Sequence, residues 1–585
     1  MPVLGLIFLR YAYSRFKYVE SEILKNRPMR RGRVMPVEPE DFKSKSALYL
    51  PEKSRYDYLL NLPDNTDMGE AINTAMELVE GQSEQLKGVL PKNYTILQDS
   101  LLRELLRIFN NSAFNEMKDD IIGRIYAYFL NKFAPAVASD DGVFFTPKSL
   151  VRMIVNVIEP THGTVLDPAC GSGGMFVSSA DFIEQYGANA NTAMTFYGQE
   201  KVDYNAKLCM MNMAVHGLNA KIVSGDEANS FYHDAHNLEG SCDYVMANPP
   251  FNVDKVKSET AQNAGRLPFG LPGVNKNKEI GNGNYLWISY FHAYLNETGR
   301  AGFVMASSAT DSQGKDKDIR EKLISTGDVD VMLSVGNNFF YTKSLPCTLW
   351  FFDKAKREEN KDKVLFIDAR NYYTAVDRTL NEWSEWQMKN LNAIVWLYRG
   401  EIEKYKDLLE NYYDYIRVGH LPLTDLGISE KLSDMMLKIN KISTFKDIVD
   451  LAKLECERLK TESKKELENA SAKEKRIINN SLENKINYLN EYIEICNDAI
   501  WLTEKFGEGE YKDILGLCKL ASRDEIKEKG CSLTPGAYVG VAPVEDDGVD
   551  FATRMAEIHN ELLALQAESN KLMETISKNM KEMGL

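Results

Sequence analysis

The chain is poor in positive charge for a protein that could act on nucleic acid. Its 585 residues hold 70 Lys and Arg against 85 Asp and Glu, which gives a formal net charge of −15. A protein that binds DNA unaided gains most of its affinity by neutralising phosphates with Lys and Arg. If the chain does chemistry on DNA, we therefore expect a more basic partner to hold the duplex.

Cysteine and histidine are too scattered to predict a disulfide framework or a metal site. The eight cysteines form no C-x-x-C pair, and the seven histidines show no metal-ligand spacing. We expect free, mostly buried thiols in a reducing compartment and no bound metal ion.

Long apolar runs are missing as well. The closest candidate for a membrane or export segment is Val3–Leu9, which Arg10 ends and which no positive charge precedes. It is too short for a membrane span of ~20 residues, and it lacks the charged start of a signal peptide. We therefore expect a cytoplasmic protein that does not contact a membrane.

The residues that are present predict three domains, because the chain is too long for one compact core. Residues 1–135 are expected to be helical, since segments such as Leu101–Phe109 and Ile121–Phe133 carry apolar residues at three- and four-residue spacing. Residues 136–430 are expected to form an α/β catalytic domain, and residues 431–585 a helical extension.

The middle region alternates short apolar runs with amphipathic stretches, which predicts a parallel, doubly wound sheet covered on both faces. Strands are expected at Thr164–Leu166, Thr195–Tyr197, Lys221–Val223, Asp243–Met246, Ala301–Met305 and Leu345–Phe352. Helices are expected at residues 203–217, 283–297 and 315–326.

The C-terminal extension is expected to hold a long charged helix over residues 430–500 and a last helix with a regular apolar stripe. The stripe follows a heptad pattern, with Ser569 filling one position of the series. Its apolar members are Met555, Ile558, Leu562, Leu565, Leu572 and Ile576. A helix with such a stripe must bury it, either against the long charged helix of this chain or against helices of a partner.

A glycine turn at Val165–Phe176, VLDPACGSGGMF, predicts a cofactor site. It combines a strand, a turn and a helix start, where glycines let the backbone approach a ligand and the helix offers free N–H groups. Such turns bind nucleotide-like cofactors at the carboxyl end of a strand. A dinucleotide fingerprint would need glycine where Phe176 stands, so a dehydrogenase is disfavoured, and an acid, Asp167, leads the turn instead.

Two more predicted strands end in a carboxylate. Phe196–Glu200 places Glu200 where an acid can accept both ribose hydroxyls of an adenosine. Val223–Asp226 places Asp226 where it can accept an adenine amino group. Together with the glycine turn, these acids favour a cofactor that contains adenosine.

The segment Asp243–Phe251, DYVMANPPF, is expected to carry the chemistry. The exocyclic amine of adenine is a poor nucleophile because its lone pair is delocalised into the ring. The side-chain oxygen of Asn248 and the carbonyl of Pro249 can accept its two N–H groups and draw the nitrogen out of plane, so that it attacks a methyl sulfonium. Pro249 and Pro250 fix the turn because their φ angles are locked, and Phe251 offers a face on which an extruded base can stack.

With DPACGSGG and NPPF in this order, the chain resembles the amino-methyltransferases that use S-adenosylmethionine. Just upstream, VFFTPK at Val143–Lys148 looks like the F-T-P element that closes over the cofactor in the adenine methyltransferase subunits of type I restriction-modification systems. The helical start, the charged helix, the turn LTPGAYVG and the terminal heptad helix also look like that family. The resemblance covers nearly the whole chain and implies a Rossmann-like methyltransferase sheet with an N-terminal helical domain and a C-terminal, coiled-coil-like helical extension.

The motifs and the resemblance together predict the residues of the site. The expected catalytic residues are Asn248, Pro249, Pro250 and Phe251. The residues expected to contact S-adenosylmethionine are Phe144, Phe145, Thr146, Pro147, Lys148, Asp167, Gly171, Ser172, Gly173, Gly174, Glu200 and Asp226. Members of the family usually carry a few tens of residues before the equivalent of VLGLIFLRY, so we expect the start of this chain to be truncated or misassigned.

The resemblance implies methylation at N6 of a flipped adenine in double-stranded DNA. It also implies an assembly of two copies of this chain with one specificity subunit, which a restriction-translocase subunit joins for cleavage. Reading of the target and much of the phosphate contact would then belong to the partner. Two alternatives remain: methylation of another planar amine or amide, such as an RNA base or a protein glutamine, and a catalytically silent scaffold, which the intact NPPF and glycine turn disfavour.

Overall fold

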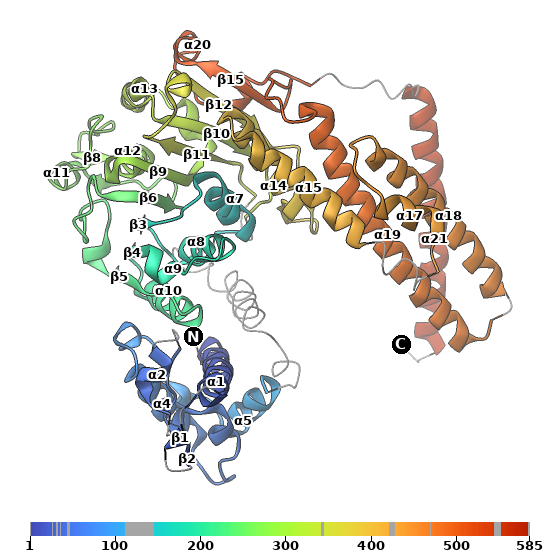
Figure 1. Cartoon of the computed structure of the whole chain (residues 1–585), viewed down its shortest axis with the longest axis horizontal. Helices are drawn as coiled ribbons and strands as arrows, with labels where there is room; N and C mark the ends of the chain where they lie inside the picture. The colour runs from blue at the N-terminus through green and yellow to red at the C-terminus, as the bar shows by residue number, and fades with distance from the viewer. Residues whose placement is uncertain are drawn as a thin grey trace. The chain divides into compact units, whose positions relative to one another are not determined.

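The computed structural model describes residues 2–25, 27, 29–30, 33–34, 37–43, 47–110, 146–340, 344–419, 427–468, 470–542 and 551–582. The chain forms two compact units, Met1–Val539 and Gly540–Leu585, whose elements are drawn in Figure 1. The helix predicted at residues 121–133 lies outside the described residues.

The described N-terminal part is helical, as predicted. Its elements are α1 (Pro2–Lys25), β1 (Met29–Arg30), β2 (Arg33–Val34), α2 (Pro39–Lys43), α3 (Tyr56–Leu60), α4 (Met68–Glu80) and α5 (Asp99–Ile108). Arg10 is buried among their apolar side chains, and its Nε donates to the carbonyl of Phe109 at 3.2 Å. The same apolar cluster includes Leu208, Met211 and Val215, so the N-terminal helices share a core with the α/β region.

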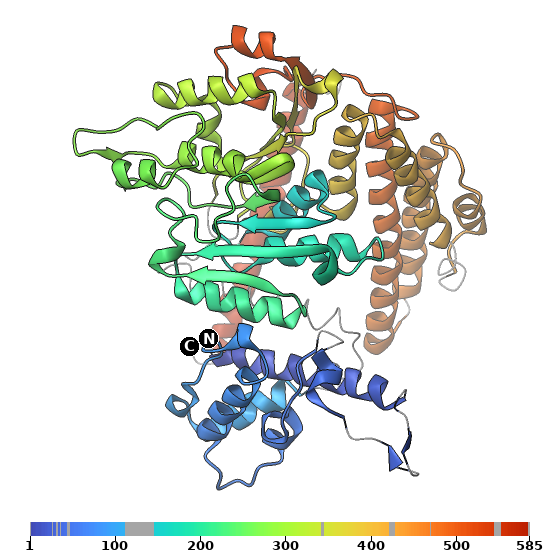
Figure 2. The same cartoon turned by 60° about the vertical axis from the view of Figure 1, so that its left-hand side comes forward.

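A nine-stranded sheet forms the centre of the α/β region (Figure 2). In spatial order its strands are β15 (Cys518–Ser522), β12 (Lys363–Asp368), β10 (Val329–Val335), β11 (Cys347–Asp353), β9 (Leu295–Ala306), β6 (Cys242–Ala247), β3 (Gly163–Asp167), β4 (Met194–Glu200) and β5 (Ala220–Ser224). All the strands predicted from the sequence are present.

The sheet is mixed, whereas the sequence predicted a parallel one. The run β5, β4, β3, β6, β9 is parallel, but β11 is antiparallel to both β9 and β10, and β15 is antiparallel to β12. The connection from Val335 to Cys347 is shorter than the dozen or more residues that a parallel crossover needs, so the chain turns back on itself after β10. The parallel half, which contains the predicted site, agrees with the prediction.

The sequence did not predict three strands of the sheet, β10, β12 and β15. Every residue of β10, VDVMLSV, is buried, and a strand that is buried on both faces lacks the alternation of polar and apolar residues that marks a strand. β15 is a short segment, CKLAS, that follows the long C-terminal helices and pairs with β12, with Ala521 opposite Val364.

Helices cover both faces of the sheet, as predicted. Successive side chains of a strand point to opposite faces, so Val165 packs in one apolar cluster and Leu166 in the other. The cluster around Val165 includes side chains of α7 (Lys148–Ile158), α8 (Gly174–Glu184), α10 (Asp203–Val215) and α14 (Glu385–Tyr398). The cluster around Leu166 includes side chains of α12 (Asn284–Tyr294), α13 (Lys315–Thr326) and α20 (Arg523–Glu528). The remaining short elements of this region are α9 (Ala190–Ala193), β7 (Val256–Lys257), α11 (Ser258–Asn263), β8 (Glu279–Ile280), β13 (Thr374–Ala375) and β14 (Asn381–Glu382).

The long charged helix predicted over residues 430–500 is in fact several helices. After α15 (Ile402–Val418) and α17 (Glu430–Leu437), the chain forms α18 (Thr444–Glu468) and α19 (Ala472–Phe506), which lie side by side in Figures 1 and 2. The start of α19 is a capping box in which Ser471 N donates to the Glu474 carboxylate at 2.8 Å and the Ser471 hydroxyl accepts from Glu474 N. The S-x-x-E signal was present in the sequence SAKE but was hidden within the charged run.

The second unit contains α21 (Phe551–Glu582), which confirms the predicted terminal helix. The described apolar side chains of its stripe are exposed, from 38% at Ile558 to 60% at Leu562. They are Met555, Ile558, Leu562, Leu565 and Leu572, and the side chain of Ile576 lies outside the described residues. The sequence predicts that this stripe is covered either by the long charged helices of this chain or by helices of a partner, and both coverings stay predictions.

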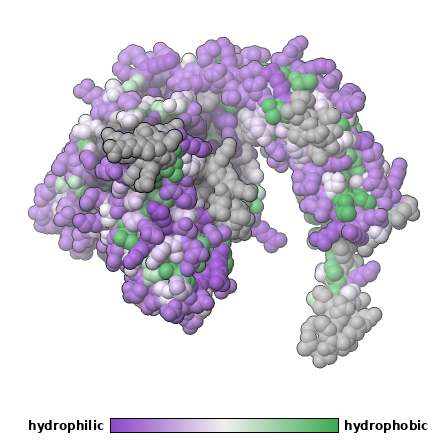
Figure 3. Space-filling model, turned by 60° about the horizontal axis from the view of Figure 1, so that its bottom comes forward, coloured by the Kyte–Doolittle hydropathy of each residue, from purple (hydrophilic) through white to green (hydrophobic). Residues whose placement is uncertain are grey.

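Other properties of the surface and the thiols follow the sequence. All eight cysteines are free and buried, as expected. Among the described helices, none is both long enough and apolar enough to cross a membrane. The face drawn in Figure 3 is mostly hydrophilic, and its apolar side chains gather in small separate groups.

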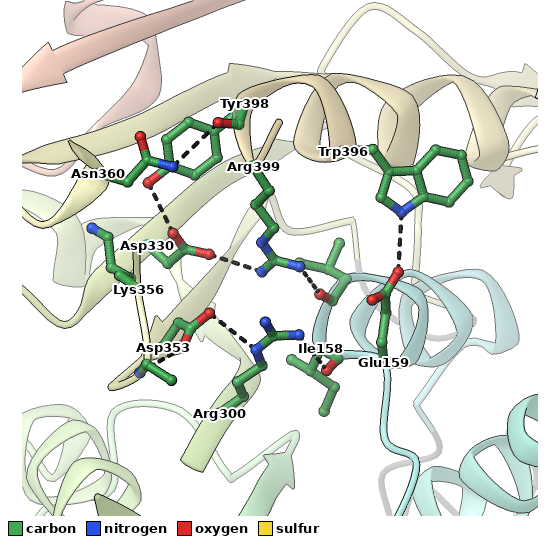
Figure 4. A network of polar contacts seen from close by, with 12 residues as sticks. Ile158, Glu159, Arg300, Asp330, Asp353, Lys356, Asn360, Trp396, Tyr398 and Arg399 are labelled. Atoms are coloured by element: carbon green, nitrogen blue, oxygen red, sulfur yellow. Dashed lines mark hydrogen bonds and ion pairs between the residues drawn. The ribbon is translucent and has the colours of Figure 1, made fainter. Parts of the chain in front are cut away.

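A buried ion pair joins α14 to the sheet (Figure 4). Arg399 donates from Nη2 to the Asp330 carboxylate at 2.8 Å and from Nη1 to the carbonyl of Val157 at 2.7 Å. Tyr398 donates its hydroxyl to the other oxygen of Asp330 at 3.0 Å. Burial opposes ionisation of Asp330, but the charges of Arg399 and Lys356 outweigh it and hold the pKa of Asp330 below its ordinary value. The pair thus fastens α14 to β10 and to the end of α7.

Removing one partner of this pair should destabilise the protein strongly. Arg399→Met leaves the Asp330 carboxylate buried without its counter-charge, and we expect the free energy of unfolding to fall by about 3–5 kcal/mol. Urea denaturation followed by circular dichroism measures the change. As a control, Lys446→Met breaks the exposed pair of Lys446 with Glu504 and should leave the unfolding midpoint in place. Equal midpoints for the Arg399 variant and the wild type would contradict this account.

Candidate active site

The carboxyl ends of four parallel neighbours, β5, β4, β3 and β6, bring the predicted residues to one edge of the sheet. Asp167 ends β3, Glu200 ends β4, Asp226 follows β5, and Asn248 follows β6. This edge is where ligands bind in open α/β sheets. Residues that are distant in the sequence therefore share one site.

The glycine turn has the backbone that its sequence predicted. Gly171 and Gly173 have φ angles of 52° and 77°, in the left-handed region that favours glycine. A Cβ on Gly173 would lie 2.8 Å from the sulfur of Cys209, whereas one on Gly174 would meet no atom within 4 Å. The turn is thus packed tightly on the protein side and open beyond Gly174, where α8 begins with free N–H groups. Asn212 supports the turn by donating from Nδ2 to the carbonyl of Ser172 at 2.9 Å.

Glu200 links β4 to the glycine turn. Its Oε2 accepts from the backbone N of Gly171 at 3.0 Å, and its Oε1 accepts from the backbone N of Val202 at 2.8 Å. Burial raises the pKa of this carboxyl, and the two backbone N–H groups oppose that rise. Each carboxylate oxygen has a second lone pair, so the side chain can still accept hydroxyl groups of a ligand.

The other two acids of the edge differ in exposure. Asp167 is only 2% exposed, and its Oδ1 accepts from the backbone N of Ala169 at 3.0 Å. Burial, and to a lesser extent the charge of Glu200, raises the pKa of Asp167 to about 8, so the carboxyl is largely protonated at neutral pH. Asp226 is exposed at the start of the turn Asp226–Ala228 and can reach a ligand from solvent.

The NPPF turn presents an amide with one free end. Asn248 donates from Nδ2 to the hydroxyl of Thr146 at 3.1 Å. Its Oδ1 is buried and has no hydrogen-bond partner among the described residues. A buried acceptor without a partner is costly in a protein interior, so this atom is a strong candidate to meet a donor on a ligand.

The remaining predicted residues are only partly described. Pro249 is buried and Pro250 exposed, whereas Phe251 is half-buried and packs edge-on against Phe340, with ring centroids 6.3 Å apart. Upstream, Thr146 and Pro147 lead into α7, whose first residue is Lys148. Phe144 and Phe145 lie outside the described residues.

Comparison with known proteins decides the family. The sequence matches the N-6 DNA Methylase family over residues 117–410 and the HsdM N-terminal domain over residues 1–109. The MjaIX methylase subunit of a type I restriction enzyme from Methanocaldococcus jannaschii is 31% identical, over 100% of this chain and 87% of the relative. The chain belongs to the methylase subunits of type I restriction enzymes.

Other members support the same assignment. The HindI methylase subunit of Haemophilus influenzae is 28% identical to this methylase subunit over 88% of this chain and 93% of the relative. A solved type I methyltransferase subunit from Streptococcus thermophilus has a TM-score of 0.54 and 17% identity over 67% of this chain and 87% of that chain, which supports the fold. The family and the enzyme class predicted from the sequence, an adenine-specific DNA methyltransferase, are confirmed.

The methylase subunit also contains a supporting residue that sequence reasoning missed. Gln199 is fully buried, and its Nε2 donates to the hydroxyl of Ser230 at 3.1 Å and to the carbonyl of His233 at 3.2 Å. Ser230 in turn donates to the carbonyl of Pro168 at 2.6 Å. Gln199 therefore fastens the loop after Asp226 to β4 and to the glycine turn. The only sequence signal was a polar residue within an apolar strand, FYGQE.

The methylase subunit should become less stable as pH rises toward the pKa of Asp167. The folded chain holds a proton on Asp167 that the unfolded chain releases, so the stabilisation by this group is complete below the ordinary pKa of Asp and is lost as pH rises to about 8. The expected slope is at most about 1.4 kcal/mol per pH unit. Urea denaturation from about pH 6.5 to about pH 8 measures it.

Two variants test whether Asp167 is the group that causes this pH dependence of stability. Asp167→Asn keeps an acceptor for Ala169 N but cannot ionise, so it should flatten this slope. Asp226→Asn removes an exposed carboxyl from the same edge and should keep the wild-type slope. An unchanged slope in the Asp167 variant would show that this carboxyl is not protonated in the folded protein.

Proposed function

We propose that this methylase subunit binds S-adenosylmethionine at the edge formed by β3, β4 and β5 and methylates an adenine held by the NPPF turn. The observation that carries the proposal is the buried Oδ1 of Asn248, which has no partner within the described part of the chain, at the same sheet edge as a glycine turn that is open on its outer side. The first supplies an acceptor for an amine, and the second supplies room and N–H groups for a cofactor.

The residues of this edge fit the proposed cofactor. The turn Gly171–Gly174 and the start of α8 would hold the polar part of the molecule, Glu200 would accept its ribose hydroxyls, and Asp226 would accept its adenine amino group. Thr146 accepts a hydrogen bond from Asn248, and the neighbouring Phe144, Phe145, Pro147 and Lys148 belong to the same proposed set. When bound, S-adenosylmethionine supplies an electrophilic methyl group on a sulfonium.

The NPPF turn would prepare the target amine. Asn248 Oδ1 accepts one N–H of the amine, and the carbonyl of Pro249 accepts the other. The two acceptors draw the hydrogens to one side and localise the lone pair on N6, which makes the nitrogen a nucleophile. Phe251, with Phe340 edge-on beside it, offers an apolar wall for a base extruded from the duplex. The amine loses its proton after the methyl group has been transferred, so no general base with a special pKa is needed.

We also propose that the subunit works in an assembly. The partners would be double-stranded DNA, a specificity subunit, a second copy of this chain and a restriction-translocase subunit. Two observations support a partner that reads the DNA: the net charge of −15 disfavours unaided binding, and α21 exposes a regular apolar stripe. The specificity subunit would cover that stripe.

Two substitutions should separate cofactor binding from catalysis. Asn248→Ala should abolish methyl transfer and keep S-adenosylmethionine affinity, because Asn248 acts on the adenine. Glu200→Ala should weaken cofactor binding by about 1.5–3 kcal/mol, the loss expected for a hydrogen bond to a charged group. Calorimetry and transfer of labelled methyl groups to DNA measure the two effects. Wild-type transfer by the Asn248 variant would contradict the mechanism, and unchanged affinity of the Glu200 variant would remove Glu200 from the site.

The stripe of α21 can be tested by truncation and by charge. A chain that ends before Asp550 should bind S-adenosylmethionine but no longer co-purify with its specificity subunit, and full-length Leu562→Glu should show the same loss. Asn560→Glu adds the same charge outside the stripe and should leave the complex intact. If the truncated chain still assembles and methylates DNA normally, the stripe does not bind the partner.

A further inference from the structure

Two asparagines close a ring of hydrogen bonds at the exit of the NPPF turn. Asn252, the residue after Phe251, donates from its backbone N to Oδ1 of Asn284 at 2.8 Å. Asn284 donates from its Nδ2 to Oδ1 of Asn252 at 2.9 Å. Asn252 has a φ of 55°, which few residues other than glycine and asparagine adopt readily. The side chain of Asn284 therefore holds both the backbone and the side chain of a residue in an uncommon conformation.

Asn284 is itself held firmly. It is 2% exposed and begins α12, whose next residues, Tyr285–Trp287, are buried in the apolar core. The residue before it, Gly283, donates to the carbonyl of Val253 at 2.8 Å. A Cβ on Gly283 would lie 3.1 Å from the ring of Phe231, so a larger residue would require that ring to move by a few tenths of an ångström. The start of α12 is thus a fixed support, built into the core, against which the exit of the turn rests.

The NPPF turn needs such a support because the sheet holds only its entry. β6 ends at Ala247, and the catalytic residues follow in a stretch that pairs with no strand of the sheet. At the entry side, Asn248 donates to Thr146. At the exit side, Asn252 follows Phe251 and is held by Asn284, and its Oδ1 also accepts from Nδ2 of Asn282 at 3.1 Å. Reacting groups must be held within a fraction of an ångström, and a misplacement of about 1 Å can cost ~10²-fold in rate.

We propose that Asn284 is a positioning residue for methyl transfer. Its amide fixes the exit of the NPPF turn and thereby the direction of the Asn248 and Pro249 oxygens and the place of Phe251. Because the side chain of Asn284 bonds to Asn252, we expect it to act on the turn through Asn252 and not by direct contact with cofactor or base. The inference rests on the proposed role of Asn248, but it assigns a function to an asparagine that lies outside every motif singled out in the sequence.

The first test removes the ring. The full chain is assayed with its specificity subunit on an unmethylated DNA duplex. This duplex carries the sequence at which the host DNA is methylated. Asn284→Ala should lower kcat by ~10²-fold. The Kd and KM for S-adenosylmethionine should stay close to wild type, because the glycine turn is untouched. Asn277→Ala changes an exposed asparagine in the segment between β7 and β8, and as the matched control it should keep the wild-type kcat.

The second test keeps size and shape. In Asn252→Asp the Nδ2 of Asn284 already donates to the position of the new carboxylate. In Asn284→Asp the side chain of Asn252 can turn its Nδ2 toward the new carboxylate. The double variant places two carboxylates where the Asn284 amide now donates to the Asn252 amide. Its kcat should fall by more than the product of the single effects. If Asn284→Ala fails to fold, the coupling between the two Asp substitutions still tests whether Asn284 positions the NPPF turn.

Three results would overturn the inference. They are a wild-type kcat for Asn284→Ala, a kcat loss matched by an equal loss of S-adenosylmethionine affinity, and independent effects of the two carboxylates. A wild-type rate for Asn248→Ala would instead overturn the proposed function. The two failures are therefore distinguishable in one set of assays.

Discussion

The parallel pairing of β3 with β4 and β6 is the constraint on which the rest of the site depends. In this register Leu166 lies opposite both Tyr197 and Val245, so the three strands reach the same edge together. The glycine turn, Glu200 and the NPPF turn become neighbours for that reason. Backbone hydrogen bonds of the sheet set the spacing between the glycine turn, Glu200 and the NPPF turn before any side chain of the candidate site contributes.

Two side-chain amides at this edge of the sheet differ in how many of their hydrogen-bonding groups have a partner. Gln199 uses both ends of its amide, since its Nε2 donates to loop atoms and its Oε1 accepts from Ala235 N at 3.2 Å. Asn248 uses only its donor end among the described residues. An amide with every bond satisfied stabilises the loops around it, whereas one with a free buried acceptor is suited to a ligand. The same chemical group therefore supports the surrounding loops at one position, and at the other it is the residue for which we propose a role in catalysis.

Sequence reasoning found what short, contiguous patterns encode. The glycine turn, the NPPF turn, the flanking helices and the strands of the parallel half could all be predicted, because each depends on neighbours in the sequence. β10 was missed since its uniform burial removes alternation, and the start of α19 was missed since a capping box sat inside a run of charge. Phe340 and Asn284 were missed for another reason. Each contacts the site through residues far along the chain, and nothing local distinguishes it from an ordinary core or loop residue. Gln199 gave one local signal, a polar residue in an apolar strand, but its partners Ser230 and His233 lie 31 and 34 residues further along the chain.

Because β15 pairs with β12, the helices α18 and α19 lie in the connection between two neighbouring strands of the sheet and are not a separate C-terminal extension. The chain leaves the sheet after β12, forms the long helices, and returns to add one more strand at the edge. A fragment that ended at residue 430 would expose the backbone of β12, with Val364 and Phe366 beside it, as a template for pairing with other chains. Any shortened version of this protein would therefore have to replace the helices with a linker that lets the last strand come back.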